Sequence, residues 1–178
     1  MMTSAFSASR RARWVPGIVL SLLLAPTACS SSSDGPNYDG MFAPPPAGPI
    51  TANNVRGFWV AHIKRDAGDG VDADMDIRMR ITDANLTIAN RCRYTDGTSL
   101  TAGITVALRI DDAQTDLITS ESAESAPAAA NHTCRLAVQA GTLEYHLNGR
   151  ELHFQGRDLP YPKFANANES PPFTKAAD

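Results

Sequence analysis

The sequence of 178 residues lacks the features that mark several common classes of protein. It contains only 3 cysteines, without the close spacing that a zinc ribbon or a small disulfide-packed toxin requires. Aromatic residues make up 7% of the chain and the formal net charge is −3, so there is no basic surface for nucleic acid. What remains, with 43% hydrophobic and 20% charged residues, fits one ordinary globular domain with additional segments.

Motifs for catalysis are missing too. The sequence contains no Gly-x-Ser-x-Gly nucleophile turn, no His-Glu-x-x-His zinc motif and no glycine-rich phosphate loop. We therefore predict that the protein is not an enzyme and needs no cofactor. His62 stands alone on the first predicted strand, where a histidine is more often a rim or core residue than a general base.

The beginning of the chain has the features of an export signal. Arg10, Arg11 and Arg13 precede the short, uncharged apolar run of residues 14–25. A transmembrane helix needs about 20 apolar residues, so the run favours a cleaved signal peptide over a permanent membrane helix. Ser9 before the arginines adds a faint likeness to a twin-arginine signal, so both export routes stay open.

A cysteine follows the apolar run where a signal peptide would end. Residues 24–29 read Leu-Ala-Pro-Thr-Ala-Cys, and small residues directly before a cysteine resemble the signal peptide of bacterial lipoproteins. Pro26 and Thr27 stand where that family prefers Leu and Ala or Ser. The resemblance implies that residues 1–28 are removed and that Cys29 is acylated, since two or more acyl chains anchor a protein stably in a membrane.

The resemblance also implies a location and a division of the chain. Ser30, rather than Asp, follows the cysteine, which in this family favours the outer membrane, with the domain facing the periplasm. The chain then has a signal peptide (1–28), the lipidated cysteine with a flexible Ser- and Pro-rich tether (29–53), a β-domain (54–157) and a Pro-rich C-terminal tail (158–178).

The central part alternates between apolar and polar residues. In residues 71–81 the odd positions are apolar and every even position is charged, which is the period of a strand with one buried face. Residues 86–94 repeat the pattern on even positions. Pairing Ile81 with Leu86 places both apolar faces on the same side of the sheet.

Two turns predict further registers. A three-residue loop at 96–98, with a bulge, places Tyr94 opposite Leu100. Asn148-Gly149 is a strong two-residue hairpin signal and places Leu147 opposite Arg150. Further strands are predicted at 57–63, 115–121 and 132–139, and the Ala-rich segment 122–130 is interpreted as a loop.

About eight antiparallel strands, each with one apolar face, bury that face most simply by curling into a small up-and-down barrel. A β-sandwich is the alternative. The inward residues are bulky Met, Ile, Leu and Val, so we expect side chains to fill much of the interior.

Gly57-Phe58-Trp59 on the first strand resembles the Gly-x-Trp signature of lipocalins, whose tryptophan packs across the closed end of an eight-stranded barrel. The resemblance implies a lipocalin-like barrel that carries a small apolar ligand. The family's Thr-Asp-Tyr turn and its late arginine, which packs on the tryptophan, have no match in this sequence. The alternative is that Trp59 is an ordinary core aromatic residue.

Two cysteines remain after Cys29. Cys92 and Cys134 both fall on predicted inward faces of an exported domain, which predicts a disulfide bond between them.

Two groups of polar residues have ligand chemistry. The predicted Asn148-Gly149 hairpin gathers zinc- or copper-binding side chains on its polar face, but opposite charges on a solvated ladder explain them as well, and we expect no metal there. The side chains on the polar face of this hairpin are Glu144, His146, Glu151 and His153.

Five aspartates between positions 66 and 76 allow a Ca²⁺ site or a solvated acidic loop, and this choice stays open.

Two classes of function remain. In the first, the barrel is a non-catalytic binding or interaction module, tethered to the membrane, that meets a protein partner in the cell envelope. In the second, it is a lipocalin-like carrier of a small apolar ligand. A lined cavity of at least ~300 Å³ would favour the carrier. We favour the binding module because the inward residues are bulky.

Overall fold

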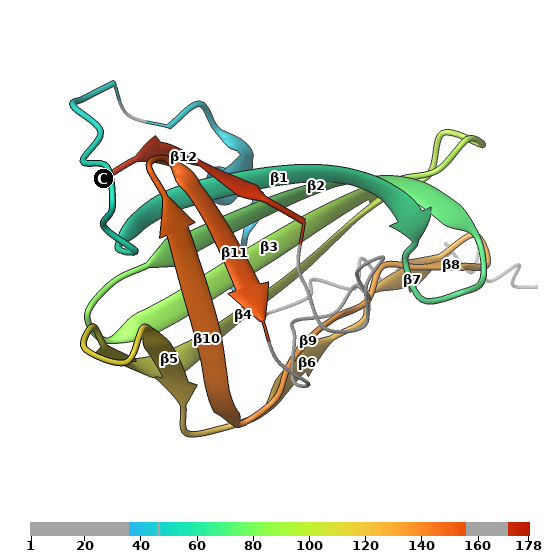
Figure 1. Cartoon of the computed structure of the whole chain (residues 1–178). Helices are drawn as coiled ribbons and strands as arrows, with labels where there is room; N and C mark the ends of the chain where they lie inside the picture. The colour runs from blue at the N-terminus through green and yellow to red at the C-terminus, as the bar shows by residue number, and fades with distance from the viewer. Residues whose placement is uncertain (1–35, 46, 156–170) are drawn as a thin grey trace, which may run out of the picture. The chain divides into compact units, whose positions relative to one another are not determined.

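The alternating segments pair into a closed antiparallel barrel in the computed structural model, which describes residues 36–45, 47–155 and 171–178 (Figure 1). The order around the barrel is β1-β12-β11-β10-β5-β4-β3-β2, so barrel strands lie beside one another in chain order and β12 closes on β1. The predicted all-β, up-and-down barrel is confirmed. Its strands are β1 (Gly57–Asp66), β2 (Asp72–Ile81), β3 (Asn85–Arg93), β4 (Ser99–Asp111), β5 (Asp116–Thr119), β10 (Gly141–Asn148), β11 (Glu151–Gln155) and β12 (Phe173–Ala177).

Shorter strands between β5 and β10 pair outside the barrel. β6 pairs with β9 and β7 pairs with β8, so residues 123–138 form one interrupted hairpin, called the end hairpin below. At its tip Ala130 and Asn131 have φ values of 51° and 67°, the two positive values of a type I′ turn. The four strands are β6 (Ala123–Ser125), β7 (Ala128–Ala129), β8 (His132–Thr133) and β9 (Leu136–Val138).

The end hairpin corrects two predictions. Residues 132–139 do not supply a barrel strand, and residues 122–130 are not only a loop because they carry β6 and β7. The alternation did indicate a buried face, since Leu136 and Val138 are both 0% exposed. Alternation shows which face is buried but not which sheet a strand joins.

The last barrel strand comes from the predicted tail. β12 lies between β1 and β11, so the predicted end of the β-domain at residue 157 is wrong. Phe173, Lys175 and Ala177 are buried on alternate positions. A five-residue strand with a lysine at its centre, directly after two prolines, is too short and too polar to be found by periodicity.

The register between β2 and β3 is as predicted, whereas that between β3 and β4 is not. Ile81 lies opposite Leu86. Leu100 lies opposite Cys92 rather than Tyr94, because the three-residue loop begins one position earlier and ends at Gly97. Gly97 has φ of 90°, the left-handed conformation that the last residue of such a loop adopts.

The hairpin between β10 and β11 also differs by two residues. Leu147 lies opposite Leu152, so the turn residues are Gly149 and Arg150 rather than Asn148 and Gly149. Gly149 has φ of 64° at the first central position, as in a type II′ turn. A shift of two residues keeps each side chain on its own face, so both errors leave the predicted inward and outward faces correct.

Bulky side chains occupy the interior, as predicted. The inward residues of the barrel strands and the buried residues of the end hairpin belong to one apolar cluster. Trp59, Met75 and Phe154 are each at most 1% exposed. Burial of each large apolar side chain contributes about 1.5–3 kcal/mol, so this cluster supplies the main driving force for closing the barrel.

The segment before the barrel packs on its outer surface. It contains the short 3₁₀-helix η1 (Asp39–Phe42). The Tyr38 ring lies so close over Gly103 of β4 that a Cβ at that position would collide with it. The guanidinium of Arg91 on β3 lies 3.1 Å from the carboxylate of Asp39 in η1. The predicted flexible tether at 29–53 is therefore wrong for its described part. No helix in the described part of the chain is long and apolar enough to cross a membrane.

We expect Gly57→Ala to lower the free energy of unfolding by at least about 2 kcal/mol. Gly57 has φ of 129°, and a Cβ there would lie 2.5 Å from the Ala177 carbonyl oxygen and 2.7 Å from Lys175 Cε. Urea denaturation measures the change. Gly48→Ala is the matched control because nothing lies within 4 Å of its Cβ position, and equal effects at both glycines would contradict this account of the β1–β12 contact.

Candidate functional site

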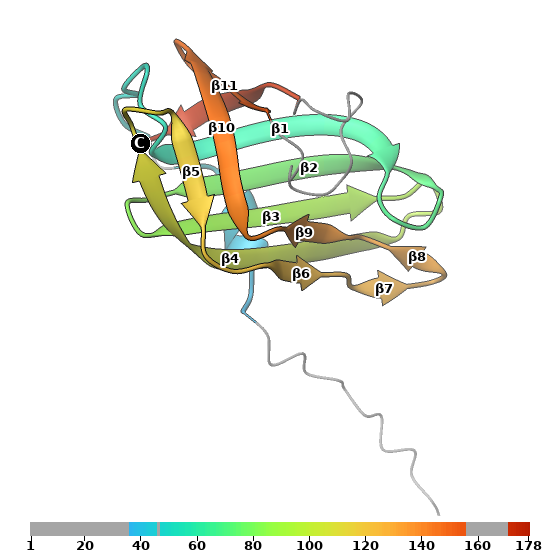
Figure 2. The ribbon, with the colours of Figure 1, turned by 60° about the horizontal axis from the view of Figure 1, so that its bottom comes forward.

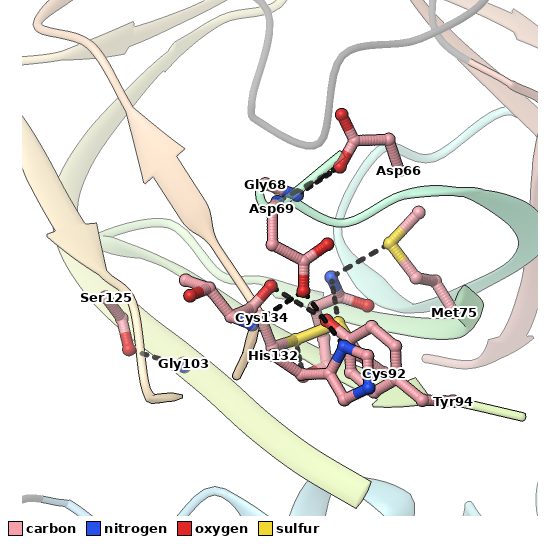
Figure 3. The surroundings of a disulfide bond; sticks show 12 residues. Asp66, Gly68, Asp69, Met75, Cys92, Tyr94, Gly103, Ser125, His132 and Cys134 are labelled. Atoms are coloured by element: carbon pink, nitrogen blue, oxygen red, sulfur yellow. Dashed lines mark hydrogen bonds and ion pairs between the residues drawn. A yellow bond between two sulfur atoms is a disulfide. The ribbon is translucent and has the colours of Figure 1, made fainter. Parts of the chain in front are cut away.

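The end hairpin is joined covalently to the barrel. Cys92 of β3 and Cys134 form the predicted disulfide bond, with 5.8 Å between their Cα atoms (Figure 3). Both cysteines are 0% exposed. Figure 2 shows β6 beside β4, with β9 next to β6. The bond closes a loop between residues 42 positions apart, which stabilises the fold by roughly 4 kcal/mol in the chain-entropy model.

A histidine of the end hairpin sits between two carboxylates. His132 Nδ1 lies 3.1 Å from Asp69 in the β1–β2 loop, and its Nε2 lies 3.2 Å from Asp96 in the β3–β4 loop. The imidazole stacks on Tyr94, with 3.9 Å between ring centroids and 13° between planes (Figure 3). Each ring nitrogen therefore faces one carboxylate, and the tautomer of the ring decides which nitrogen donates. These four residues are called the His132 clamp below.

Backbone groups next to the His132 clamp join the same contact. The Thr133 N–H donates to Asp69 Oδ2 at 2.9 Å, and the Tyr94 hydroxyl donates to the Thr133 carbonyl at 2.8 Å. The Arg135 N–H donates to the Ala67 carbonyl at 2.9 Å. The loops after β1 and β3 are therefore both attached to one arm of the end hairpin.

The carboxylates of the His132 clamp are held in the ionised form. Partial burial raises the pKa of Asp69, but hydrogen bonds from the N–H groups of Thr133 and Val71 and from His132 outweigh it, so the pKa lies below its ordinary value. The Thr98 N–H and hydroxyl, followed by His132, lower the pKa of Asp96. The pKa values of both carboxylates therefore lie below the ordinary value of an aspartate.

The acidic loop uses its oxygens on backbone donors rather than on a cation. Asp66 Oδ1 accepts the N–H groups of Gly68, Asp69 and Gly70 at 2.8–3.1 Å. Asp69 Oδ1 accepts the N–H of Val71 at 2.9 Å. These hydrogen bonds fix the conformation of the loop between β1 and β2.

The His and Glu residues of the β10–β11 hairpin share one outer face, with changed partners. His146 lies opposite His153, whereas the predicted register, with Leu147 opposite Arg150, would have placed it opposite Glu151. His146 pairs with Glu144 of its own strand at 3.2 Å. Among the described residues no group of three or more His, Cys, Asp or Glu side chains could hold a metal ion, so the zinc or copper alternative has no support in the geometry.

A lysine and a tryptophan close the other end of the barrel. Trp59 is 0% exposed, and Lys175 Nζ lies 5.6 Å from the centroid of its ring. The Lys175 side chain is also 0% exposed, but its ammonium group finds three acceptors, the carbonyls of Thr51 and Asn54 at 2.9 and 3.2 Å and Asp178 at 2.5 Å. Hydrogen bonds from Lys175 and then Thr51 lower the pKa of Asp178 to about 2.

The sequence analysis singled out neither Lys175 nor His132. Lys175, which packs against Trp59, lies in the segment predicted to be a Pro-rich tail. His132 lies at the start of a predicted strand and belongs to no recognised motif. Its partners come from two loops far away in the sequence. They could have been predicted only from a model of which loops lie together at one end of the barrel.

A groove of about 480 Å³ lies on the outer surface, between the N-terminal segment and the barrel. Its lining is mostly apolar, and the Arg80 guanidinium has no partner among the described residues. The residues that line this groove include Tyr38, Met41, Pro44, Pro45, Phe58, Arg80 and Thr87.

His62, on the outer face of β1, lines a different hollow beside Asp76 and Arg78.

No protein-family model, curated protein or solved structure matches this chain.

We expect Asp69→Asn to destabilise the protein by about 1–2 kcal/mol at pH 7, because it weakens hydrogen bonds to a charged acceptor. Since the folded state lowers the pKa of Asp69, its contribution is present above pH ~4 and is lost as the pH falls through the folded-state value. Urea unfolding at pH 7 and pH 3 measures both effects. Asp74→Asn, on an exposed position of β2, is the control. A difference that persists unchanged at pH 3 would contradict the electrostatic origin.

Proposed function

We propose that this protein is a cell-envelope lipoprotein whose barrel acts as a non-catalytic binding module. The observation that carries the proposal is the closed and occupied interior. Large side chains fill the space between the strands, the end hairpin covers one end, and Trp59 with Lys175 covers the other. A barrel in this state has its binding surface on the outside.

The groove beside the N-terminal segment suits a protein partner better than the other outer hollows do. Phe58, Met41 and Tyr38 offer apolar contact, and Arg80 offers a charge without a partner. Arg56, in the hollow of about 710 Å³ near Tyr145, is already engaged by Asp83 and by both oxygens of Asp112. The groove therefore fits a partner segment with an apolar residue next to an acidic one.

The N-terminal segment supports a short distance between barrel and membrane. Tyr38 packs on β4 and stands nine positions after Cys29. Even a fully extended chain of nine residues spans at most about 32 Å. An acyl group on Cys29 would keep the groove near the membrane surface, where envelope proteins are found.

The anchor is tested by labelling with tritiated palmitate in a diderm bacterium that expresses the full chain. We expect labelling of the unchanged protein, no labelling of Cys29→Ala, and unchanged labelling of the neighbouring control Ser30→Ala. Labelling of Cys29→Ala at the original level, or none of the unchanged protein, would overturn the lipoprotein part of the proposal.

The groove is tested by photo-crosslinking in the native membrane. A photoreactive residue at position 58 should give one discrete protein adduct, and Arg80→Glu should reduce its yield at least tenfold because it reverses the only unpaired charge among the groove's described residues. The same photoreactive residue at Thr142, on an exposed position of β10, is the control. Equal adducts from both positions would overturn the groove as the binding surface.

A further inference from the structure

The end hairpin is built as a separable unit. Its strands pair with each other and, in the described part of the chain, form no ladder with the barrel strands. Leu136 and Val138 nevertheless reach into the apolar cluster of the barrel. The hairpin therefore covers the interior without being part of the barrel sheet, which is the arrangement of a lid.

Many of the polar contacts between the end hairpin and the described part of the barrel depend on side chains. They include the Cys92–Cys134 bond, the His132 clamp, and a hydrogen bond from the Gly103 N–H to Ser125 Oγ at 3.3 Å. The Arg135 N–H adds one backbone bond to the loop after β1. Contacts of this kind are lost together when one segment opens locally, while the barrel ladder remains intact.

A polar group without a partner lies beneath the end hairpin. Asn90 of β3 is 0% exposed, and its Nδ2 lies 3.4 Å from both Met75 Sδ and Cys92 Sγ. Its Oδ1 has no hydrogen-bond partner. A buried acceptor without a hydrogen bond costs about 1–3 kcal/mol. The side-chain Oδ1 of Asn90 would therefore bind a hydrogen-bond donor of a ligand favourably.

We propose that the end hairpin is a redox-released lid over a binding site for a neutral apolar molecule with one hydrogen-bond donor, and that Asn90 is the polar anchor of this site. The inference goes beyond the outer groove and does not depend on Cys29. In the oxidised protein Leu136 and Val138 occupy the space that the ligand takes when the hairpin withdraws.

The releasing step is thiol–disulfide exchange with a dithiol reductant. A thiolate of the reductant attacks one sulfur of Cys92–Cys134, the S–S bond breaks, and the other cysteine leaves as a thiolate and takes up a proton. The second reductant thiol then attacks the mixed disulfide and frees the remaining cysteine. The dithiol is oxidised to a disulfide and the protein gains two electrons and two protons.

The His132 clamp controls how often this step is possible. Both sulfur-bearing residues are 0% exposed, so a reductant reaches them only after the hairpin has opened locally. The rate of reduction is then the intrinsic exchange rate multiplied by the opening equilibrium. His132 is a positioning residue in this scheme, because it sets the opening equilibrium without touching the ligand or the sulfur atoms that react.

The first experiment measures thiol release by dithiothreitol from the oxidised full chain carrying Cys29→Ser, which has no acyl group and no third thiol. We expect His132→Phe, which keeps an aromatic ring against Tyr94 but removes both ion pairs, to be reduced about tenfold faster, equivalent to about 1.4 kcal/mol. His146→Phe, on the outer face of β10, is the control and should leave the rate unchanged. Equal rates for both variants would overturn the guarding role of the clamp.

The second experiment follows N-phenyl-1-naphthylamine, a neutral apolar amine with one N–H group whose fluorescence rises in apolar surroundings. We expect the reduced protein to keep its far-UV circular dichroism and to bind one probe molecule that the oxidised protein excludes. Asn90→Leu, which removes the acceptor but keeps the core apolar, should weaken binding to the reduced protein three- to tenfold.

Each other result of the second experiment contradicts the proposal. Loss of the far-UV signal on reduction would show that the disulfide bond is a structural staple only. A folded reduced protein that excludes the probe, or an oxidised protein that binds it equally, would show that the end hairpin is not a lid. Unchanged binding by Asn90→Leu would remove Asn90 from the site.

Discussion

A sheet made of strands with one apolar face must hide both that face and its two edges, and this constraint organises the whole structure. Closing the sheet on itself meets both needs, but only if the last strand reaches the first. Here that strand is β12, which pairs with β1 and with β11. The Trp59–Lys175 contact lies at this seam, so the same residues that close the sheet also close one end of the barrel.

The opposite end is closed by different means. In the described residues, the end hairpin forms no strand ladder with the barrel. The Cys92–Cys134 bond and the contacts of His132 with two carboxylates attach it to the barrel instead. Side-chain contacts of this kind respond to protonation and reduction, whereas a strand ladder does not. The two ends therefore differ in kind: the Lys175 end is part of the sheet, and the His132 end is fastened to it.

Much of the fold was accessible from periodicity alone. The alternating runs predicted the strands that became β1 to β4, β10 and β11, and the side of the sheet that each side chain faces. The register errors at Gly97 and Gly149 came from assigning the right glycine to the wrong turn position. Each error was a shift of two residues, so the predicted inward or outward direction of every side chain on these strands stayed correct. The disulfide pair followed from two cysteines on predicted inward faces of a chain that was expected to be exported.

The sequence by itself determined the all-β class, the bulky interior, the inward faces and the Cys92–Cys134 bond, because these depend on a local period of two and on residue type. Tertiary structure alone decided the seam at β12, the end hairpin, the groove around Arg80 and the His132 clamp. Each of these joins segments far apart along the chain. The short strand that makes the seam has little local signal, and a histidine lies between two aspartates only once the end hairpin meets the loops after β1 and β3.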